Sequence, residues 1–327
     1  MKKKNKKCVL LLPYFGKFNN YFQLFLNSCK KNPTYNWIIF TDCTDKYDYP
    51  VNVRVVPMTL YELKKIAEKK LGFSVRMETP YKLCDYKPAY GFLFEEYIEE
   101  YEYWGHCDCD LIFGNLEKML TPLLSQNYDK LFAAGHLTIY KNNYENNRKF
   151  MSSCDDEYYY KNAFTTDNIC VFDEDYSKNG QKKNIHTIFL KTNSNMYEKD
   201  ISFNVTSKFA RIRHSYYAPR ERKFLWEEFR KSRFYWDSGN IIEVYYDKKN
   251  LSIKRNEYIY IHLQNRKMRI KNNILKANNI IEILPDRFKA RKKIPTTLKE
   301  MKLLTIKLPY LYWFDIYLKK IKLKLGR

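Results

Sequence analysis

Two carboxylates stand two residues apart in this sequence, Asp108 and Asp110, at the end of an aromatic and apolar run. Side chains alternate between the faces of an extended strand, so both acids are predicted to point one way and Cys109 the other. A carboxylate pair on one face suits a hard divalent cation, which can in turn hold a diphosphate. Because buried, unpaired acids are costly, we expect an opposite charge beside them. A solvated strand end is the open alternative.

The elements before this pair alternate between strand and helix. Apolar runs predict buried strands, and helical spacing predicts helices, in the order strand 9–14, helix 20–31, strand 37–42, strand 53–57, helix 59–71, helix 86–101 and the strand that carries the acids. Thr59 and Glu62 form a capping box at the start of the predicted helix 59–71, and Gly72 follows the end of that helix. This order predicts an α/β fold with a largely parallel sheet, whose strands collect ligands at their carboxyl ends.

Beyond residue 115 the pattern loosens. Residues 131–135, 169–172 and 258–262 are predicted strands, and residues 142–167 are predicted loop and short helix. No clear linker precedes about residue 285. We therefore expect one domain over residues 1–285 and a basic helical extension over 286–327.

Charge is concentrated in that extension. The formal net charge of the chain is +22, and residues 286–327 hold thirteen Lys or Arg and three Asp or Glu, a net of +10 from 13 − 3. One helical stripe is apolar and lysines flank it; the stripe comprises Leu311, Phe314, Leu318, Ile321 and Leu325. Such a helix suits an anionic membrane surface, although a helix docked on the body remains the alternative. No nucleic-acid-binding signature is present, so nucleic acid is not the expected partner.

The eight cysteines are predicted to be reduced and mostly buried. The lone Cys107–Cys109 pair lacks a second pair at zinc spacing. The apolar run near the start is short and has no small-residue cleavage site, and no segment has about 20 uninterrupted apolar residues. We expect a cytoplasmic protein without a membrane span.

Several segments, taken in order, resemble nucleotide-sugar-dependent glycosyltransferases of the GT-A fold. They are KLCDYKPAYG at 82–91, WGHCDCDLIFGN at 104–115, GHLTIY at 135–140, FDE at 172–174 and IHLQNRKM at 261–268. The closest resemblance is to bacterial proteins of this kind that act in capsule, exopolysaccharide or lipopolysaccharide synthesis. It covers roughly residues 8–270, and it implies a GT-A-like sheet flanked by helices.

The resemblance implies a metal site for Mn²⁺ or Mg²⁺. Asp108 would approach the ribose or the metal, Asp110 would bind the metal, and His262 would supply a third, imidazole ligand. A nitrogen ligand tilts the choice toward Mn²⁺. A satisfied core histidine is the alternative reading of His262.

It also implies contacts to the nucleotide sugar. The residues are Tyr14 and Phe15 against the base, Asp42 on the base or ribose, Lys87, Arg266 and Lys267 near the phosphates, and His136 in the sugar pocket. Each has a plainer reading: Tyr14 and Phe15 as core, Asp42 as a turn cap, Lys87 as a solvated helix residue and His136 as a turn residue.

An inverting transfer needs a carboxylate base to deprotonate the acceptor hydroxyl. Asp173 and Glu174 follow an apolar run and are the first candidates, and the resemblance points to them too. The rivals are Asp155, Asp156, Glu157 and Asp237, and a charged turn is the alternative reading of Asp173 and Glu174.

The sequence thus predicts a metal-dependent transferase that moves a sugar from a nucleoside diphosphate, UDP being favoured, to a glycan acceptor, expected to be lipid-linked. It would work at the inner face of the cell membrane in surface polysaccharide synthesis. The alternatives are a sugar-phosphate transferase that uses the same diphosphate site, and a basic nucleic-acid-binding protein.

Overall fold

The computed structural model describes residues 6–176, 181–206, 211–228, 230–247, 249–271, 274, 280–303, 317, 318 and 321. Its first sheet has seven strands in the order β3-β2-β1-β4-β7-β6-β8. The strands are β1 (Lys6–Pro13), β2 (Tyr35–Thr41), β3 (Val53–Pro57), β4 (Tyr101–Cys107), β6 (Lys130–Leu131), β7 (Leu137–Lys141) and β8 (Met196–Tyr197). Strands β3, β2, β1 and β4 are parallel to one another, whereas β7 runs antiparallel to β4. The sheet is therefore mixed, but only β7 is reversed, because β6 and β8 run in the same direction as β4, and the expectation of a mostly parallel sheet is confirmed for this sheet.

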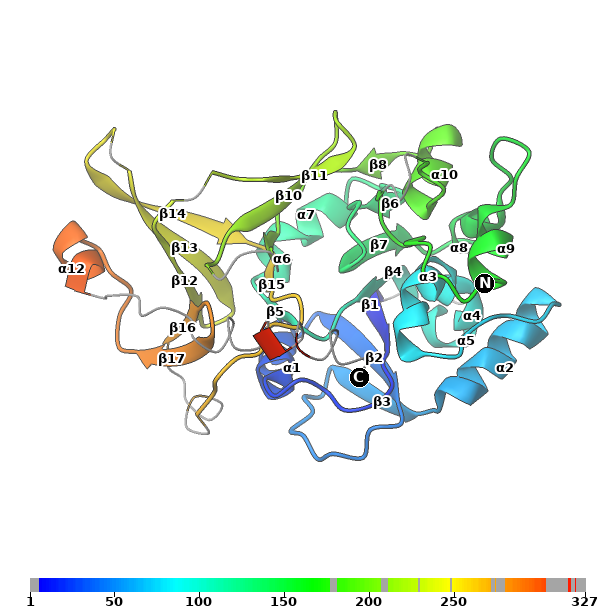
Figure 1. Ribbon diagram of the computed structural model, residues 1–327, viewed down its shortest axis with the longest axis horizontal. Helices are drawn as coiled ribbons and strands as arrows, with labels where there is room; N and C mark the ends of the chain where they lie inside the picture. Colours follow the sequence, from blue (N-terminus) through cyan, green and yellow to red (C-terminus); the bar gives the residue numbers. More distant parts are fainter. Residues whose placement is uncertain are drawn as a thin grey trace.

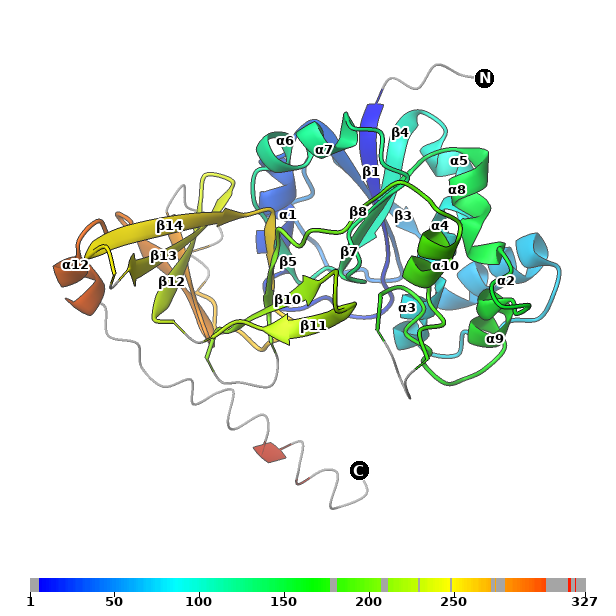
Figure 2. The same ribbon diagram turned by 90° about the horizontal axis from the view of Figure 1, so that it is seen from above.

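Helices cover both faces of this sheet (Figure 2). Alternate residues of β1 enter two different cores: Val9 and Leu11 pack with one group of helices, and Leu10 and Leu12 with another. The first group contains α2 (Leu60–Leu71), α3 (Leu83–Tyr86), α4 (Tyr90–Leu93), α5 (Glu95–Ile98), α9 (Tyr159–Phe164) and α10 (Ile185–Lys191), and the second contains α1 (Phe22–Lys30), α6 (Leu116–Met119) and α7 (Thr121–Leu124). Helix α8 (Tyr144–Arg148) completes the set between β7 and α9. The two-residue period of the strand thus builds a helix–sheet–helix sandwich, as expected for an α/β protein.

Two further sheets extend from this sandwich (Figure 1). The second sheet has the order β11-β10-β9-β15-β5, and the third has the order β14-β13-β12-β16-β17. The second is built from β5 (Leu111–Phe113), β9 (Phe203–Val205), β10 (His214–Ala218), β11 (Lys223–Trp226) and β15 (Tyr260–His262). The third is built from β12 (Ser232–Asp237), β13 (Asn240–Asp247), β14 (Ser252–Tyr258), β16 (Ile280–Leu284) and β17 (Arg287–Arg291). Apolar side chains of both sheets share one core with α1, which joins them to the sandwich.

Local signals in the N-terminal half are confirmed. Strands β1, β2 and β3 lie where the apolar runs place them. Helix α2 begins after Thr59, whose side chain and that of Glu62 form the expected capping box. Gly72 ends the helix with a positive φ of 78°, a left-handed conformation that glycine adopts without strain.

Other local predictions are wrong. Residues 86–101 do not form one helix, because Pro88 lacks an N–H; the chain makes a 3-10 turn at Lys87–Ala89 between α3 and α4. Residues 169–172 form no strand, and Val171 has a φ of 57°. The strand expected at 131–135 ends at Leu131, since Phe132 has a φ of 71°.

The C-terminal boundary also differs from expectation. Strands β16 and β17 form a hairpin whose turn contains Pro285 and Asp286, so residues 287–291 belong to the third sheet and not to a separate extension. Helix α12 (Leu298–Leu303) follows. Most of the amphipathic stripe predicted at 311–325 lies outside the described residues.

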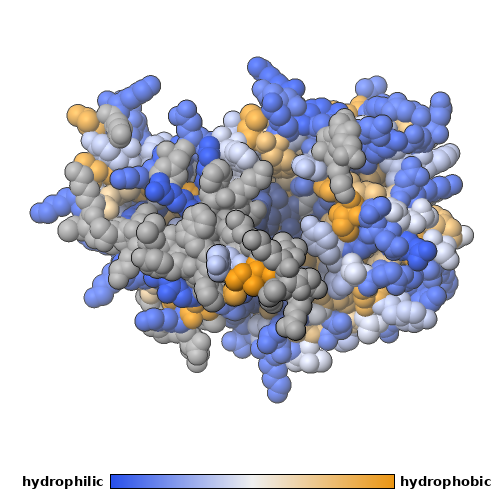
Figure 3. All heavy atoms as spheres, in the orientation of Figure 1, coloured by the Kyte–Doolittle hydropathy of each residue, from blue (hydrophilic) through white to orange (hydrophobic). Residues whose placement is uncertain are grey.

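All eight cysteines are unpaired, as expected from their apolar surroundings. Within the described part of the chain, no helix has both the length and the apolar character that a bilayer crossing requires. The face seen in Figure 3 is mostly hydrophilic, with a few separate apolar areas.

Candidate active site

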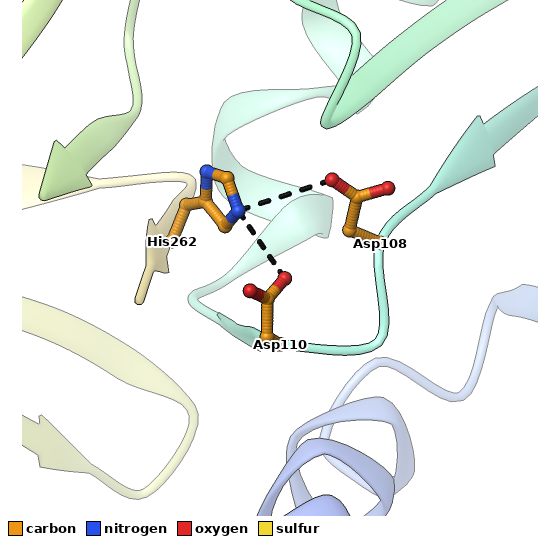
Figure 4. Close-up of side chains that lie close together, drawn as sticks. All are labelled: Asp108, Asp110 and His262. Carbon is orange, nitrogen blue, oxygen red and sulfur yellow. Dashed lines mark ion pairs between the residues drawn. The ribbon is translucent and has the colours of Figure 1, made fainter. Parts of the chain in front are cut away.

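The two acids lie in the turn that joins β4 to β5. Strand β4 ends at Cys107 and β5 begins at Leu111, so the expectation that Asp108 and Asp110 lie in a strand is wrong. Strand β5 pairs with β15, and the register places His262 opposite Leu111. The turn therefore brings both carboxylates to one imidazole, as Figure 4 shows: Nε2 of His262 lies 3.2 Å from Oδ1 of Asp110 and 3.8 Å from Oδ2 of Asp108.

These three side chains form a possible metal site. Each offers one ligand atom, and the three atoms lie within 4.8 Å of one another. Two carboxylate oxygens and one imidazole nitrogen suit Mn²⁺ well and Mg²⁺ less well, because Mg²⁺ prefers oxygen ligands. The residues fit the cation that the sequence predicts.

Neighbouring groups hold both inner ligands in place. Asn204 accepts a hydrogen bond from Nδ1 of His262 at 3.0 Å, which fixes the ring so that Nε2 faces the acids. Gln264 donates to the same amide oxygen at 3.0 Å. Gln264 and Asn265 both have left-handed backbones, with φ of 50° and 51°, and this turn directs the N–H of Asn265 at the carboxylate of Asp110.

The charges of Asp110 and His262 support each other. Burial alone would raise the pKa of Asp110, but His262 and the N–H of Asn265 hold that pKa below its usual value. Burial alone would lower the pKa of His262, but the carboxylates of Asp110 and Asp108 raise it. Each group thus stabilises the charged form of the other, which is the opposite charge that the sequence leads us to expect.

Lys87 links this cluster to a second pair of acids. Its ammonium group lies 2.8 Å from Oδ1 of Asp108 and 3.1 Å from Oδ2 of Asp173, and it donates to the carbonyl of Gly135 at 2.8 Å. Burial alone would lower the pKa of Lys87, but the two carboxylates raise it well above its usual value. Lys87 is therefore a fixed cation between the two acidic groups, and it is not a solvated helix residue.

The second pair consists of Asp173 and Glu174. Burial raises the pKa of Asp173 to about 6 against the opposing effect of Lys87, and burial together with Asp173 raises the pKa of Glu174 to about 7. Glu174 also accepts a hydrogen bond from the N–H of Gly135 at 3.2 Å. Glycine at position 135 allows this close approach, because a Cβ there would lie 2.7 Å from Cγ of Asp173 and would displace that carboxylate. Both carboxyls are thus poised to exchange a proton near neutral pH.

A buried ion pair fixes the segment that leads to these acids. Asp85 accepts backbone hydrogen bonds from Cys170 and Phe172, each at 3.0 Å, on either side of the left-handed Val171. Lys82 donates to Asp85 at 2.7 Å and is itself buried. A β-branched residue with positive φ is strained, so Asp85 and Lys82 impose this conformation on the chain just before Asp173.

A cleft of about 980 Å³ contains both groups of acids. Nine predicted site residues line it: Tyr14, Phe15, Lys87, Asp108, Asp110, His136, Asp173, Glu174 and His262. His136 donates or accepts at 2.7 Å with the hydroxyl of Tyr260, and its ring centre lies 4.5 Å from that of His262. Burial, followed by the neighbouring cations, lowers the pKa of His136 well below its usual value, so this ring is neutral.

The structure does not bring the other predicted residues into the cleft lining. Asp42 is exposed and accepts a hydrogen bond at 2.7 Å from the N–H of Gly16, in the loop after β1. Arg266 is buried and donates to the carbonyls of Thr206 and Pro285, and Lys267 is exposed. The rival acids Asp155, Asp156, Glu157 and Asp237 do not line the cleft either.

Sequence reasoning missed several residues of this cleft. Asn204 orients His262, yet it lies in an ordinary short apolar strand and carries no motif. Asp175, next to the acid pair, is buried and bound by Arg222 and by the hydroxyl of Tyr217. Only the run of three acids at 173–175 in the sequence could have pointed to it.

Fold and site together define an α/β protein whose cleft joins an Asp–Asp–His cluster to a second carboxylate pair. Residues 10–292 match a family of unknown function, DUF6625, and the chain belongs to this family. No curated protein matches the chain.

Proposed function

We propose that this protein is a metal-dependent glycosyltransferase of GT-A type that uses a nucleoside-diphosphate sugar. The observation that carries the proposal is the convergence of Asp108, Asp110 and His262 in one cleft with Asp173 and Glu174. One acidic group suits a cation and the diphosphate bound to it, and the other suits proton removal from an acceptor. Four parallel strands followed by an antiparallel one, with the acids directly after β4, are compatible with a GT-A-like organisation.

Asp108, Asp110 and His262 would hold Mn²⁺ or Mg²⁺. A cation bound there neutralises the charge that builds on the leaving nucleoside diphosphate. Lys87 adds a fixed positive charge next to Asp108 and is the nearest candidate for a phosphate contact. Arg266 and Lys267 have no place in this proposal, because neither lines the cleft.

Glu174 or Asp173 would act as the base in an inverting transfer. Glu174 has the pKa of about 7 that suits proton removal near neutral pH. The ammonium group of Lys87 lies next to Asp173 and favours its charged form, and the carboxylate of Asp173 would also orient the acceptor. Tyr14 and Phe15 follow β1 in the cleft wall, and Tyr14 would contact the base of the nucleotide, whereas Phe15 is buried and packs in the core, its alternative reading.

A glycan acceptor attached to lipid fits the basic C-terminal extension, and peripheral binding to an anionic membrane surface belongs to the same proposal. Replacing Lys319, Lys320, Lys322 and Lys324 with Glu should abolish sedimentation with phosphatidylglycerol-containing liposomes. Unchanged sedimentation would argue that the extension serves the fold and not the membrane.

A screen of nucleotide sugars for slow hydrolysis tests the activity. Wild-type protein with Mn²⁺ should release a nucleoside diphosphate from at least one donor, and Asp110→Ala and Glu174→Gln should release far less. Release of a nucleoside monophosphate would instead indicate a sugar-phosphate transferase, because that reaction breaks the P–O–P bridge between the two phosphate groups. Absence of turnover with every donor would argue against both activities.

A further inference from the structure

One wall of the cleft is a single row of residues paired across four strands of the second sheet. His262 on β15 pairs with Asn204 on β9, Asn204 pairs with Ser215 on β10, and Ser215 pairs with Trp226 on β11. Residues that are directly opposite on neighbouring strands project from the same face of a sheet. All four residues of this row line the cleft.

The row begins at the metal cluster and ends at an exposed aromatic ring. Neighbouring strands lie about 4.8 Å apart, so Trp226, three strands away from His262, stands about 14 Å along the wall. Phe224, two residues before Trp226 on β11, also lines the cleft and shares its face. The far end of the wall is therefore an aromatic platform well beyond the reach of the cation ligands.

Exposed aromatic side chains line the cleft. Trp226 is 44% exposed and has the guanidinium of Arg213 over its ring at 5.7 Å, and two further lining residues, Tyr81 and Tyr176, are 74% and 49% exposed. Leaving large rings in water is unfavourable, so exposed rings that line a cleft indicate a ligand with an apolar surface. Between Trp226 and His262 the paired row presents an amide, Asn204, and a hydroxyl, Ser215.

We propose that this row is the acceptor subsite, and that it binds an oligosaccharide with one pyranose ring stacked on Trp226. A sugar ring has an apolar face of C–H groups and an edge of hydroxyls, which matches an aromatic ring beside amide and hydroxyl groups. The inference rests on the proposed function, which supplies the identity of the reaction. The wall leads directly away from the donor's expected diphosphate site, where the acceptor would lie. Since the cleft has about 980 Å³, at the upper end of the range for small-molecule sites, it has room for a donor and an acceptor together.

The distance gives the proposal a specific consequence. The backbone of Trp226 lies about 14 Å along the wall from that of His262, so we place on Trp226 a sugar beyond the one that receives the transferred residue. Trp226 should therefore recognise a sugar further along the acceptor chain. A disaccharide or longer acceptor should depend on Trp226, whereas binding of a monosaccharide should not.

The test measures glycan binding and nucleotide binding separately. The purified full-length protein is applied to an array of immobilised oligosaccharides, and UDP with Mn²⁺ is titrated by calorimetry. We expect the wild type to bind at least one oligosaccharide, and Trp226→Ala to weaken that binding at least tenfold, about 1.4 kcal/mol, with UDP–Mn²⁺ binding unchanged. Trp226→Phe should retain most of the glycan binding, and Tyr61→Ala, an exposed ring outside the cleft lining, should have no effect.

The outcomes separate this inference from the proposed function. Glycan binding that Trp226→Ala leaves intact, or no glycan binding by protein that binds UDP–Mn²⁺, overturns the subsite. Glycan binding that requires Trp226, in protein that ignores UDP–Mn²⁺, supports the subsite and removes the transferase.

Discussion

Replacing Asp85 with Asn should destabilise the protein strongly, although Asp85 lies outside the two acidic groups of the cleft. Asp85 and Lys82 form an ion pair at 2.7 Å with side chains 0% and 3% exposed. Removing one partner of a buried pair costs about 3–5 kcal/mol, because the other charge stays buried without its counter-ion. Asn also keeps only one acceptor oxygen for the N–H groups of Cys170 and Phe172, and one unsatisfied donor costs about 1–3 kcal/mol. Lys82 keeps its bonds to the carbonyls of Ala163 and Asn168, which offsets part of this, so we expect a net loss of about 3 kcal/mol.

The chain provides a matched control at the same distance. Lys6 and Glu100 also form an ion pair at 2.7 Å, but their side chains are 44% and 48% exposed. Exposed pairs contribute less than about 1 kcal/mol, so Glu100→Gln should be nearly neutral. Urea unfolding of both variants at pH 7 measures the difference. If Asp85→Asn lost less than about 1 kcal/mol, and so resembled Glu100→Gln, the argument that burial makes this pair essential would be refuted.

Three further predictions concern proton balance and close packing. Because a proton on His262 competes with a cation for Nε2, Mn²⁺ binding should weaken about tenfold per unit as pH falls below the raised pKa of His262. Calorimetry from pH 6 to 8.5 measures this, and a flat profile would contradict it. Gly135→Ala should fold but lose most transfer activity, since the added Cβ would displace the carboxylate of Asp173. Near-UV circular dichroism checks the fold, and full activity in this variant would contradict the prediction. Burial, followed by the charge of Lys130, lowers the pKa of His186 to about 4. The stability that the neutral ring contributes is therefore fully present above the unfolded pKa of about 6.5 and is lost as pH falls toward 4, by up to about 3 kcal/mol. His186→Gln should flatten the pH dependence of the urea midpoint over this window, and an unchanged slope would show that other groups control it.

The first half of the fold could be predicted because its signals are local. The strand run at residues 9–14 and the caps of the helix at 60–71 each depend on neighbours within one or two turns. The run at 169–172 looked like a strand for the same reason. It failed because a distant carboxylate, Asp85, binds its N–H groups and forces Val171 into a left-handed backbone.

The site could be predicted in part, and the limit has the same cause. Asp108, Asp110 and His262 were predicted together because a family resemblance carries long-range information that spacing lacks. The assumed strand geometry was wrong, yet the acids converge, because the turn and the pairing of β5 with β15 determine where they lie. Arg266 had the residue type for a phosphate contact, but its backbone carbonyl partners lie about 20 and 60 residues away along the chain, beyond any local pattern.

Titration of the protein with UDP, with and without Mn²⁺, tests the central claim most directly. The account predicts that UDP binds only when Mn²⁺ is present, and that Asp110→Ala, which leaves the β4–β5 turn in place, abolishes this binding while the protein remains folded. UDP binding that is independent of Mn²⁺, or that survives unchanged in Asp110→Ala, would contradict the assignment of Asp108, Asp110 and His262 as a metal and diphosphate site.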